Sequence, residues 1–196
     1  DGHPAEQCGN GLRCVALLFY ETSARRRREM SLESPAGTVR ARVMDDGLVT
    51  VEMGRPDFAP AALPFGATAQ APSYTIDAGG RSVEFGAVSM GNAHVVVRVA
   101  SAAEAPVTEI GPLLERHPLF PKGTNVGFME IVDRQHITLR VHERGCGETR
   151  ACGTGASAAA AVARVWGETD DTVTVSLPGG DLDIAWKGSG ESLWMT

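Results

Sequence analysis

Two cysteines, each followed by glycines and then by an apolar stretch, are the residues of this sequence best suited to chemistry. One stands in Cys-Gly-Thr-Gly at 152–155, before a run of alanines, and the other in Cys-Gly-Asn-Gly at 8–11. The start of a helix carries unpaired N–H groups and a partial positive charge, so it attracts anions and favours a thiolate. Glycine lets a ligand approach the backbone closely. Each motif therefore predicts a partly ionised thiol beside an anion site.

The glycine-flanked cysteine motif occurs twice in the sequence. Cys8 and Cys152 lie 144 residues apart, which suggests a duplicated unit and two similar lobes. If the lobes face each other, the thiols lie on opposite sides of a bound amino acid's α-carbon. One thiolate then removes the α-proton while the other thiol delivers one, and backbone N–H groups bind the carboxylate. This chemistry needs no metal and no cofactor.

Other uses of the four cysteines fit the sequence less well. Cys8 and Cys14, like Cys146 and Cys152, are six residues apart, which matches no common zinc spacing, and the sequence has no Cys-x-x-Cys. We expect Cys14, inside a helix, and Cys146, in a loop, to be small buried residues. Neither of the common nucleotide-binding glycine motifs occurs.

Composition restricts the class of protein. The 196 residues are 43% hydrophobic and 21% charged, with a net charge of −6, which argues against a general nucleic-acid binder. No apolar run reaches the roughly 18 to 20 residues of a membrane span, and no signal peptide is visible. The few cysteines favour a reducing, cytoplasmic location. Because the chain begins without methionine and ends directly after a strand pattern, we expect it to be a fragment.

Hydrophobic patterns predict an α+β fold made mostly of antiparallel hairpins, each lobe being a sheet wrapped around a central apolar helix. A doubly wound parallel sheet fits less well, because helices and strands do not alternate regularly. Residues 12–20 should form a helix buried on most sides, and 106–117 a surface helix with Ile110, Leu113 and Leu114 inward. Strands are predicted at 38–43, 48–53, 82–88, 94–99, 125–132, 136–142, 172–177 and 181–186. The Pro- and Ala-rich segment 54–72 should link the lobes.

Four polar residues near the predicted turns have ordinary explanations when they are considered singly. His94 is typical of a buried histidine that is hydrogen-bonded in a core. Glu143 and Arg144 are typical of a surface ion pair, and Asn125 is typical of a turn. Their proximity to the cysteine motifs makes each of them a candidate for the site.

Together these stretches make the chain resemble the diaminopimelate epimerases. The matching segments follow the family's order through essentially the whole chain and are 7–14, 86–94, 125–128, 143–149, 151–155 and 177–180. The resemblance implies interconversion of LL- and meso-diaminopimelate without a cofactor, in the synthesis of lysine and of peptidoglycan precursors. From the acidic balance and the lack of a long apolar run we expect no nucleic-acid or membrane partner.

The resemblance also implies roles for individual residues. Cys8 and Cys152 are expected to be the two acid/base thiols, with His94 and Glu143 as polar partners that tune them. The remaining residues implied to bind the substrate fall into two sets. The reacting carboxylate is assigned to Gly9, Asn10, Gly153 and Thr154, and the rest of the substrate to Asn92, Asn125, Glu143 and Arg144.

The family's architecture implies two pseudo-symmetric lobes and a homodimer at full length. Residues 1–53 are expected to be what remains of a truncated first lobe, and residues 54–196 to be the second lobe. Relative to the family, the sequence lacks about half a lobe before Cys8 and a short tail at the other end. We therefore expect the 196 residues alone to be inactive or only weakly active.

The sequence leaves two other functions open. Proline or hydroxyproline racemases and epimerases of the same superfamily also use glycine-flanked cysteines, although segments 89–94 and 143–149 favour diaminopimelate. A non-catalytic relative of the fold is the other alternative, and the presence of both cysteines argues against it.

Overall fold

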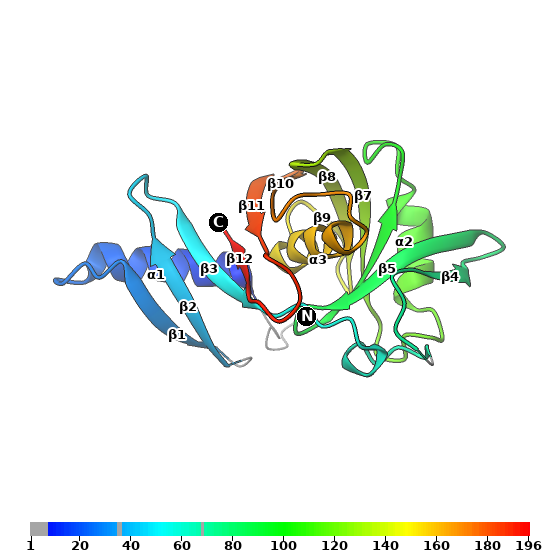
Figure 1. Ribbon diagram of the computed structural model, residues 1–196, viewed down its shortest axis with the longest axis horizontal. Helices are drawn as coiled ribbons and strands as arrows, with labels where there is room; N and C mark the ends of the chain where they lie inside the picture. The colour runs from blue at the N-terminus through cyan, green and yellow to red at the C-terminus, as the bar shows by residue number, and fades with distance from the viewer. Residues whose placement is uncertain (1–7, 35–36, 68) are drawn as a thin grey trace.

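A computed structural model describes residues 8–34, 37–67 and 69–196 and shows an α+β fold. Within them, twelve strands join in one mixed sheet in the order β1-β2-β3-β12-β11-β10-β8-β7-β6-β5-β4, with β9 added beside β8. The molecule is elongated, with a smaller part around α1 and a larger part around α3 (Figure 1). Residues 1–7, which begin the expected first lobe and include the first residue of the matching segment 7–14, lie outside the described residues. No helix in the described ranges is long and apolar enough to cross a bilayer.

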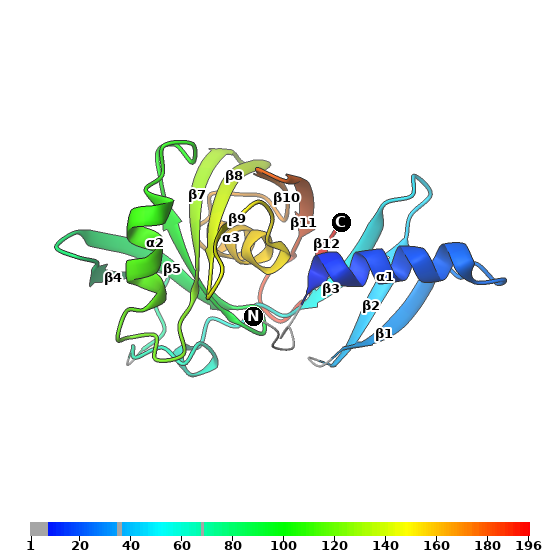
Figure 2. The ribbon, with the colours of Figure 1, turned by 180° about the vertical axis from the view of Figure 1, so that it is seen from behind.

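The smaller part is one helix on a three-stranded antiparallel sheet (Figure 2). Its elements are α1 (Gly9–Thr22), β1 (Glu29–Ser34), β2 (Gly37–Val43) and β3 (Val49–Gly54). Val39, Ala41 and Val43 alternate with exposed residues along β2 and face the core, as a one-sided sheet requires. The expectation that α1 is buried on most sides is wrong: Val15, Leu18 and Phe19 are 53%, 61% and 54% exposed.

The larger part wraps a sheet around α3 (Gly153–Val165). Every residue of α3 from Gly153 to Ala163 is buried, so its small alanines let strands approach from several directions. Strands of the larger part include, in chain order, β5 (Ser82–Ser89), β6 (Ala93–Arg98), β7 (Asn125–Asp133), β8 (His136–Glu143), β9 (Gly147–Thr149), β10 (Thr172–Leu177) and β11 (Gly180–Ala185). The apolar central helix predicted for this lobe is thus observed.

Two parallel strand pairs explain where the other helices lie. β6 pairs with β7 and β8 with β10 in parallel, and parallel neighbours need a crossover connection. α2 (Val107–Glu115) lies in the first crossover and α3 in the second. On α2, Ile110 and Leu114 are buried as predicted, whereas Leu113 is 45% exposed. The remaining strand pairs are antiparallel, which agrees with the predicted hairpins.

The C-terminal strand β12 (Leu193–Met195) joins the two parts. It pairs with β11 of the larger part and with β3 of the smaller part, both in antiparallel fashion. Leu193 and Met195 are fully buried in the core that the two parts share. One continuous sheet therefore connects the helix of the first motif with the helix of the second.

The structure confirms the predicted hairpins. Its described residues also include three strands that no clear sequence pattern predicts. β1, β4 (Tyr74–Asp77) and β9 were not predicted, because they are short or lack a run of alternating apolar residues. The segment predicted as a linker contains one short 3-10 helix, η1 (Pro60–Ala62). Its residue 68 lies outside the described residues.

Candidate active site

Cys152 is the N-cap of α3, in an extended conformation that ends where the helix begins. Its Sγ accepts a hydrogen bond from the backbone N–H of Gly155 at 3.4 Å, which satisfies one unpaired donor of the first turn. The thiol donates to Oε2 of Glu143 at 3.2 Å, and the hydroxyl of Thr154 lies 3.6 Å from the sulfur. Cys152 is 5% exposed, so the thiol is almost removed from water.

Burial changes the ionisation that the sequence suggested for Cys152. Burial is the main cause that raises the pKa of this thiol to about 12. The nearby Glu143 carboxylate acts in the same direction, and hydrogen bonds from Thr154 and Gly155 act in the opposite one. The expectation of a partly ionised thiol at this helix start is therefore wrong. Desolvation and a neighbouring negative charge outweigh the helix N-terminus, and Cys152 is protonated at neutral pH.

Glu143 is the last residue of β8, and its side chain contacts Cys152. The hydroxyl of Thr149 donates to Oε1 of Glu143 at 2.5 Å, and Gly147 pairs with Glu143 across the narrow turn to β9. The two carboxylate oxygens thus have different partners, the thiol on one and a hydroxyl on the other. Thr149 was not singled out from the sequence, because its partner is known only once β9 is seen to fold back on β8.

Cys8 occupies the matching position at the start of α1. It is the N-cap, it is exposed, and its side chain makes no capping hydrogen bond. Its carbonyl accepts from the N–H of Leu12 at 3.0 Å, which is the first bond of the helix. Cys8 is thus open to a ligand where Cys152 is enclosed. Cys14 and Cys146 are also exposed, so the expectation that they are buried is wrong.

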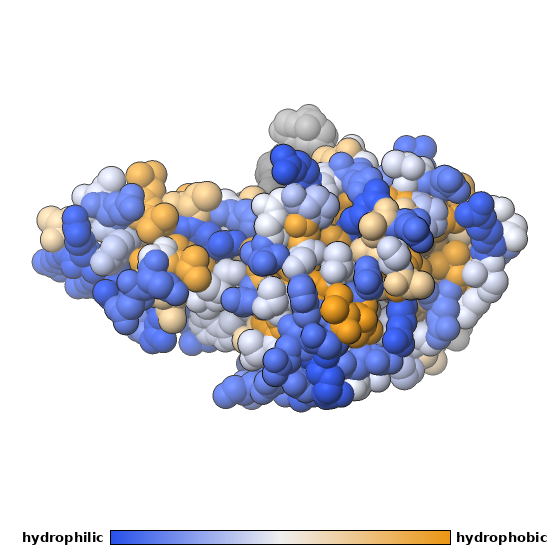
Figure 3. Space-filling model, turned by 90° about the horizontal axis from the view of Figure 1, so that it is seen from above, coloured by the Kyte–Doolittle hydropathy of each residue, from blue (hydrophilic) through white to orange (hydrophobic). Residues whose placement is uncertain are grey.

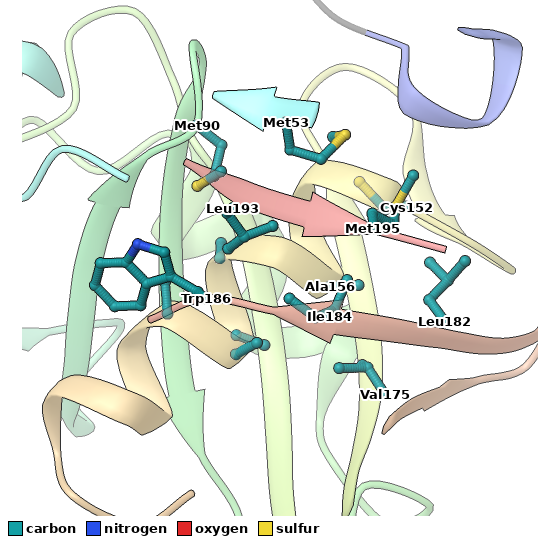
Figure 4. Close-up of a cluster of buried hydrophobic side chains, with 14 of the residues drawn as sticks. Met53, Met90, Cys152, Ala156, Val175, Leu182, Ile184, Trp186, Leu193 and Met195 are labelled. Atoms are coloured by element: carbon teal, nitrogen blue, oxygen red, sulfur yellow. The ribbon is translucent and has the colours of Figure 1, made fainter. Parts of the chain in front are cut away.

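The starts of the two helices converge on two methionines of the connecting strands. A Cβ added to Gly9 would lie 2.7 Å from Cε of Met195 and 2.9 Å from Cε of Met53, and one added to Gly153 would lie 3.1 Å from Sδ of Met195. Figure 4 shows Met53 and Met195 next to Cys152. A side chain at Gly9 would require the ends of Met53 and Met195 to move, and one at Gly153 would require Met195 to give by a few tenths of an ångström. The structure therefore brings the two predicted motifs together, as the sequence reasoning required.

Asn10 lies at the same junction with an unsatisfied polar atom. Its Oδ1 is buried without a hydrogen-bond partner and would be 3.7 Å from a Cβ on Gly153. A buried carbonyl oxygen left without a donor costs on the order of 1–3 kcal/mol. This atom is therefore suited to accept a hydrogen bond from a ligand.

His94 and Asn92 form a second predicted group at the turn between β5 and β6. His94 is 1% exposed and its Nε2 lies 2.9 Å from Oδ1 of Asn92. Burial is the main cause that lowers the pKa of His94 to about 3, and the positive charge of Arg144 acts in the same direction. The imidazole is therefore neutral at physiological pH and, with Asn92 accepting, carries its proton on Nε2.

Asn125 connects this group with the turn that carries Arg144. Its Nδ2 donates to the carbonyl of Ala93 and its Oδ1 accepts from the backbone N–H of Arg144, both at 3.0 Å. Nη1 of Arg144 donates to the carbonyl of Lys122. Arg144 directly follows Glu143, the last residue of β8. Residues at the ends of β6, β7 and β8 therefore lie together at one edge of the sheet. Within the described residues, no group of three or more His, Cys, Asp or Glu side chains is arranged to hold a metal.

Solved structures with this fold include amino-acid racemases and epimerases. A hydroxyproline epimerase from Agrobacterium vitis, solved with trans-4-hydroxy-L-proline, superposes with a TM-score of 0.65 at 20% identity over 98% of the chain. A probable proline racemase from Agrobacterium radiobacter gives 0.67 at 19% identity, again over 98%. The chain spans 63% and 64% of these two proteins. At such identities the likeness establishes the fold.

Sequence comparison identifies the family. The profile of the diaminopimelate epimerase family matches residues 1–59 and 86–196. The diaminopimelate epimerase of Pseudomonas fluorescens is 48% identical over all 196 residues, which cover 71% of its length, and that of Thioalkalivibrio sulfidiphilus is 48% identical over 192 residues and 69% of its length. The chain belongs to the diaminopimelate epimerase family.

Proposed function

We propose that this chain carries the active site of an isomerase that interconverts LL- and meso-2,6-diaminopimelate by proton transfer between two thiols, in the synthesis of lysine and peptidoglycan precursors. The observation that carries the proposal is the convergence of two glycine-flanked cysteine N-caps on Met53 and Met195. An α-carbon held between the two helix starts has one thiol on each face.

Cys152 is assigned the role of acid and Cys8 the role of base in one direction of the reaction. The thiol of Cys152 is protonated and its hydrogen bond to Glu143 fixes its orientation. Cys8 as a thiolate takes the α-proton and becomes a thiol, while Cys152 delivers its proton to the opposite face and becomes the thiolate. The configuration at the α-carbon inverts, and the reverse direction exchanges the two roles.

The substrate's carboxylate is assigned to the helix starts at Gly9, Asn10, Gly153 and Thr154. Unpaired N–H groups of a helix's first turn stabilise negative charge, including the charge that develops when the α-proton leaves. The buried Oδ1 of Asn10 is an acceptor for the α-ammonium group. An ammonium group beside Glu143 also offsets the charge that keeps Cys152 protonated, so substrate binding favours transfer of its proton.

The distal amino-acid end of diaminopimelate is assigned to Asn92, Asn125, Glu143 and Arg144. These residues supply the amide, carboxylate and guanidinium groups that a second ammonium and carboxylate need. Neutral His94 is assigned to orient Asn92 through its Nε2–H and to tune the thiols as their polar partner.

We further propose that residues 1–53 and 54–196 act as two lobes that hold the substrate between them, with 54–72 as the start of the second lobe, and that the protein works as a homodimer. Because the apolar face of α1 is exposed, the helix that carries Cys8 is supported on one side only. We therefore expect the 196 residues alone to be inactive or to turn substrate over only very slowly.

The test is to incubate the chain with LL-diaminopimelate, or with L-proline, in deuterated water and to follow the α-proton signal by NMR over hours. We expect slow loss of the signal of diaminopimelate and formation of the meso isomer, with proline unchanged. Substitution Cys152→Ala should stop both changes. Saturating diaminopimelate should also protect Cys152 from iodoacetamide, which reports binding without turnover.

Three results would contradict the proposal. Exchange of the proline signal alone would assign the site to the proline racemases. Unchanged exchange in Cys152→Ala would exclude the two-thiol mechanism. Failure of diaminopimelate both to exchange and to protect Cys152 would argue that the substrate does not bind here.

A further inference from the structure

We propose that Glu115, the last residue of α2, is a positioning residue that sets the place of Glu143 against Cys152 by anchoring the turn 143–147. The inference rests on the proposed function, because it concerns the same site, but it is carried by a separate set of contacts. Glu115 belongs to none of the segments on which the resemblance was drawn.

The carboxylate of Glu115 forms hydrogen bonds both to the end of β8 and to the turn 143–147. Its Oε2 accepts from Nε2 of His142 at 2.7 Å, and its Oε1 accepts from the backbone N–H of Gly145 at 2.9 Å. Glu115 and His142 are 9% and 6% exposed. Breaking one side of a buried, charge-assisted contact of this kind leaves the other group unpaired and is costly.

His142 and Glu143 point to opposite faces of β8, because successive side chains of a strand alternate. His142 faces α2 and meets Glu115, whereas Glu143 faces α3 and meets Cys152. The two contacts are separated by one peptide unit. Any shift of His142 or of Gly145 therefore moves the residue whose carboxylate touches the thiol.

The packing between α2 and β8 leaves little room for such a shift. A Cβ on Gly111, one turn before Glu115, would lie 2.7 Å from Cγ of His142, so the helix backbone lies directly on the imidazole ring. On the other side of the turn, the backbone N–H of Arg144 is held by Oδ1 of Asn125. Gly145 and Gly147 adopt positive φ angles of 77° and 80°, which lets the turn close between these two anchors.

The carboxylate of Glu115 remains charged in this buried position. Desolvation opposes the charge, but hydrogen bonds from His142 and from Gly145 outweigh it, so that the pKa of Glu115 is lowered. A charged acceptor binds both donors more strongly than a neutral one would. Replacement by a neutral isostere should therefore weaken the anchor without removing it.

The experiment measures the pH dependence of iodoacetamide alkylation at Cys152 in the full chain, with each cysteine followed separately by peptide mass spectrometry. The midpoint is the pH at which alkylation of Cys152 reaches half its maximal rate. Glu143→Gln removes a charge that raises the pKa of Cys152, so this midpoint should fall. At a fixed pH below the midpoint, alkylation becomes about tenfold faster for each unit by which that pKa falls.

Glu115→Ala should lower the midpoint toward the value of Glu143→Gln, because the released turn lets the carboxylate leave the thiol. Glu115→Gln keeps the shape: its Oε1 can still accept from the backbone N–H of Gly145, and its amide N–H can donate to Nε2 of His142 when that imidazole carries its proton on Nδ1. It should therefore restore most of the wild-type midpoint. The matched control is Glu109→Ala on the same helix, where an exposed carboxylate pairs with Arg81. It should leave the profile unchanged.

A double variant separates positioning from a merely structural role, because a loosened structure that exposes Cys152 would also lower the pKa of the thiol. A displaced Glu143 acts only through its charge, so Glu115→Ala should add no further midpoint shift in the Glu143→Gln background. Loosening would shift the midpoint in both backgrounds, and that result would overturn the proposal. Circular dichroism melts identify any variant that does not fold, and Glu115→Gln then carries the test with a smaller shift in the same direction.

The proposal is overturned if Glu115→Ala folds and keeps the wild-type midpoint, or if Glu143→Gln itself leaves the midpoint unmoved. Neither result depends on turnover. A shifted midpoint in a chain that exchanges no diaminopimelate would support the role of Glu115 and count only against the proposed reaction.

Discussion

At the scale of single residues, the two thiols of the motif pair are not equivalent. Cys152 is enclosed, bonded to Glu143 and protonated, whereas Cys8 is exposed and makes no capping bond. The difference does not come from the motifs, which share their glycines and their helix position. It comes from the burial of Cys152 and from the carboxylate that β8 places beside it, since both favour the neutral thiol.

Thr154→Val should slow alkylation of Cys152 at any pH below the midpoint. The Thr154 hydroxyl lies 3.6 Å from the sulfur and lowers the pKa of the thiol, so its loss raises that pKa. The rate at pH 9 should fall by about tenfold for each unit of that rise. Ser157→Ala is the control, because its hydroxyl donates to the carbonyl of Gly153 instead. A faster reaction in Thr154→Val would contradict the assignment.

At the scale of elements, the strands β3 and β12 hold the two helix starts together. One face of this pair presents Met53 and Met195 to Gly9 and Gly153. The register places Glu52 opposite Trp194, and Arg40 of β2 pairs with Glu52 while lying 5.2 Å from the centre of the Trp194 ring. The β3–β12 pair is thus apolar on the face toward the two helix starts and carries the Arg40–Glu52 ion pair on the opposite face.

The Arg40–Glu52 pair predicts a pH dependence of stability. Arg40 holds the pKa of Glu52 at about 2, below its ordinary value of 4.5. A depressed carboxyl pKa contributes stability above the ordinary value, and this contribution is lost as the pH falls toward 2. Because Arg40 is largely exposed, Glu52→Gln should lower the free energy of unfolding at pH 7 by no more than about 1 kcal/mol.

Urea denaturation at several pH values checks this prediction. The difference between wild type and Glu52→Gln should shrink between pH 4.5 and 2. A double-mutant cycle with Arg40→Gln isolates the pair from other effects. A difference that stays constant down to pH 2 would show that the charge of Glu52 is not responsible.

The contact between β5 and α3 depends on a glycine. A Cβ on Gly86 would lie 2.4 Å from Cγ1 of Val162, a branched side chain that is 1% exposed. Gly86→Ala should therefore lower the free energy of unfolding by about 1–3 kcal/mol through overpacking. Val162→Ala alone leaves a cavity, but the double variant should recover part of the loss, because the two changes compensate in volume. Additive losses, measured by thermal denaturation, would argue against a direct clash.

At the scale of the whole molecule, the two cysteine-bearing helices have different surroundings. α3 is covered by strands on several sides, whereas α1 lies on β2 and β3 and exposes an apolar face. In the view from above, hydrophobic surface atoms are visible on the smaller part, which lies at the left as in Figure 1 (Figure 3). The exposed apolar residues on α1 are Val15, Leu18 and Phe19.

A matched pair of leucine substitutions measures this asymmetry. Leu193→Ala in the fully buried β12 should lower the free energy of unfolding by about 2–5 kcal/mol. Leu18→Ala on α1, where the side chain is 61% exposed, should change it by about 0.5 kcal/mol or less. Chemical denaturation of both variants gives the comparison. A large loss for Leu18→Ala would mean that the face of α1 is covered in solution.

The local elements were predictable because each has a short-range pattern. Alternating apolar residues predicted the hairpins β2–β3, β7–β8 and β10–β11, and the alanine run predicted α3. The paired motifs also predicted that Cys8 and Cys152 would mark two helix starts. Such patterns depend on neighbours within a few positions, which the sequence displays directly.

What only the tertiary structure decided depends on residues distant in the chain. The protonated state of Cys152 follows from burial and from Glu143, and the place of Glu143 follows in our proposal from Glu115 on α2. The exposure of α1, whose composition suits a buried helix, depends on which strands cover it. The sequence by itself determined which residues begin the two helices and which chemistry they suit. The fold decided their charge, their access to water and their distance from one another, because those properties depend on surroundings that no local pattern records.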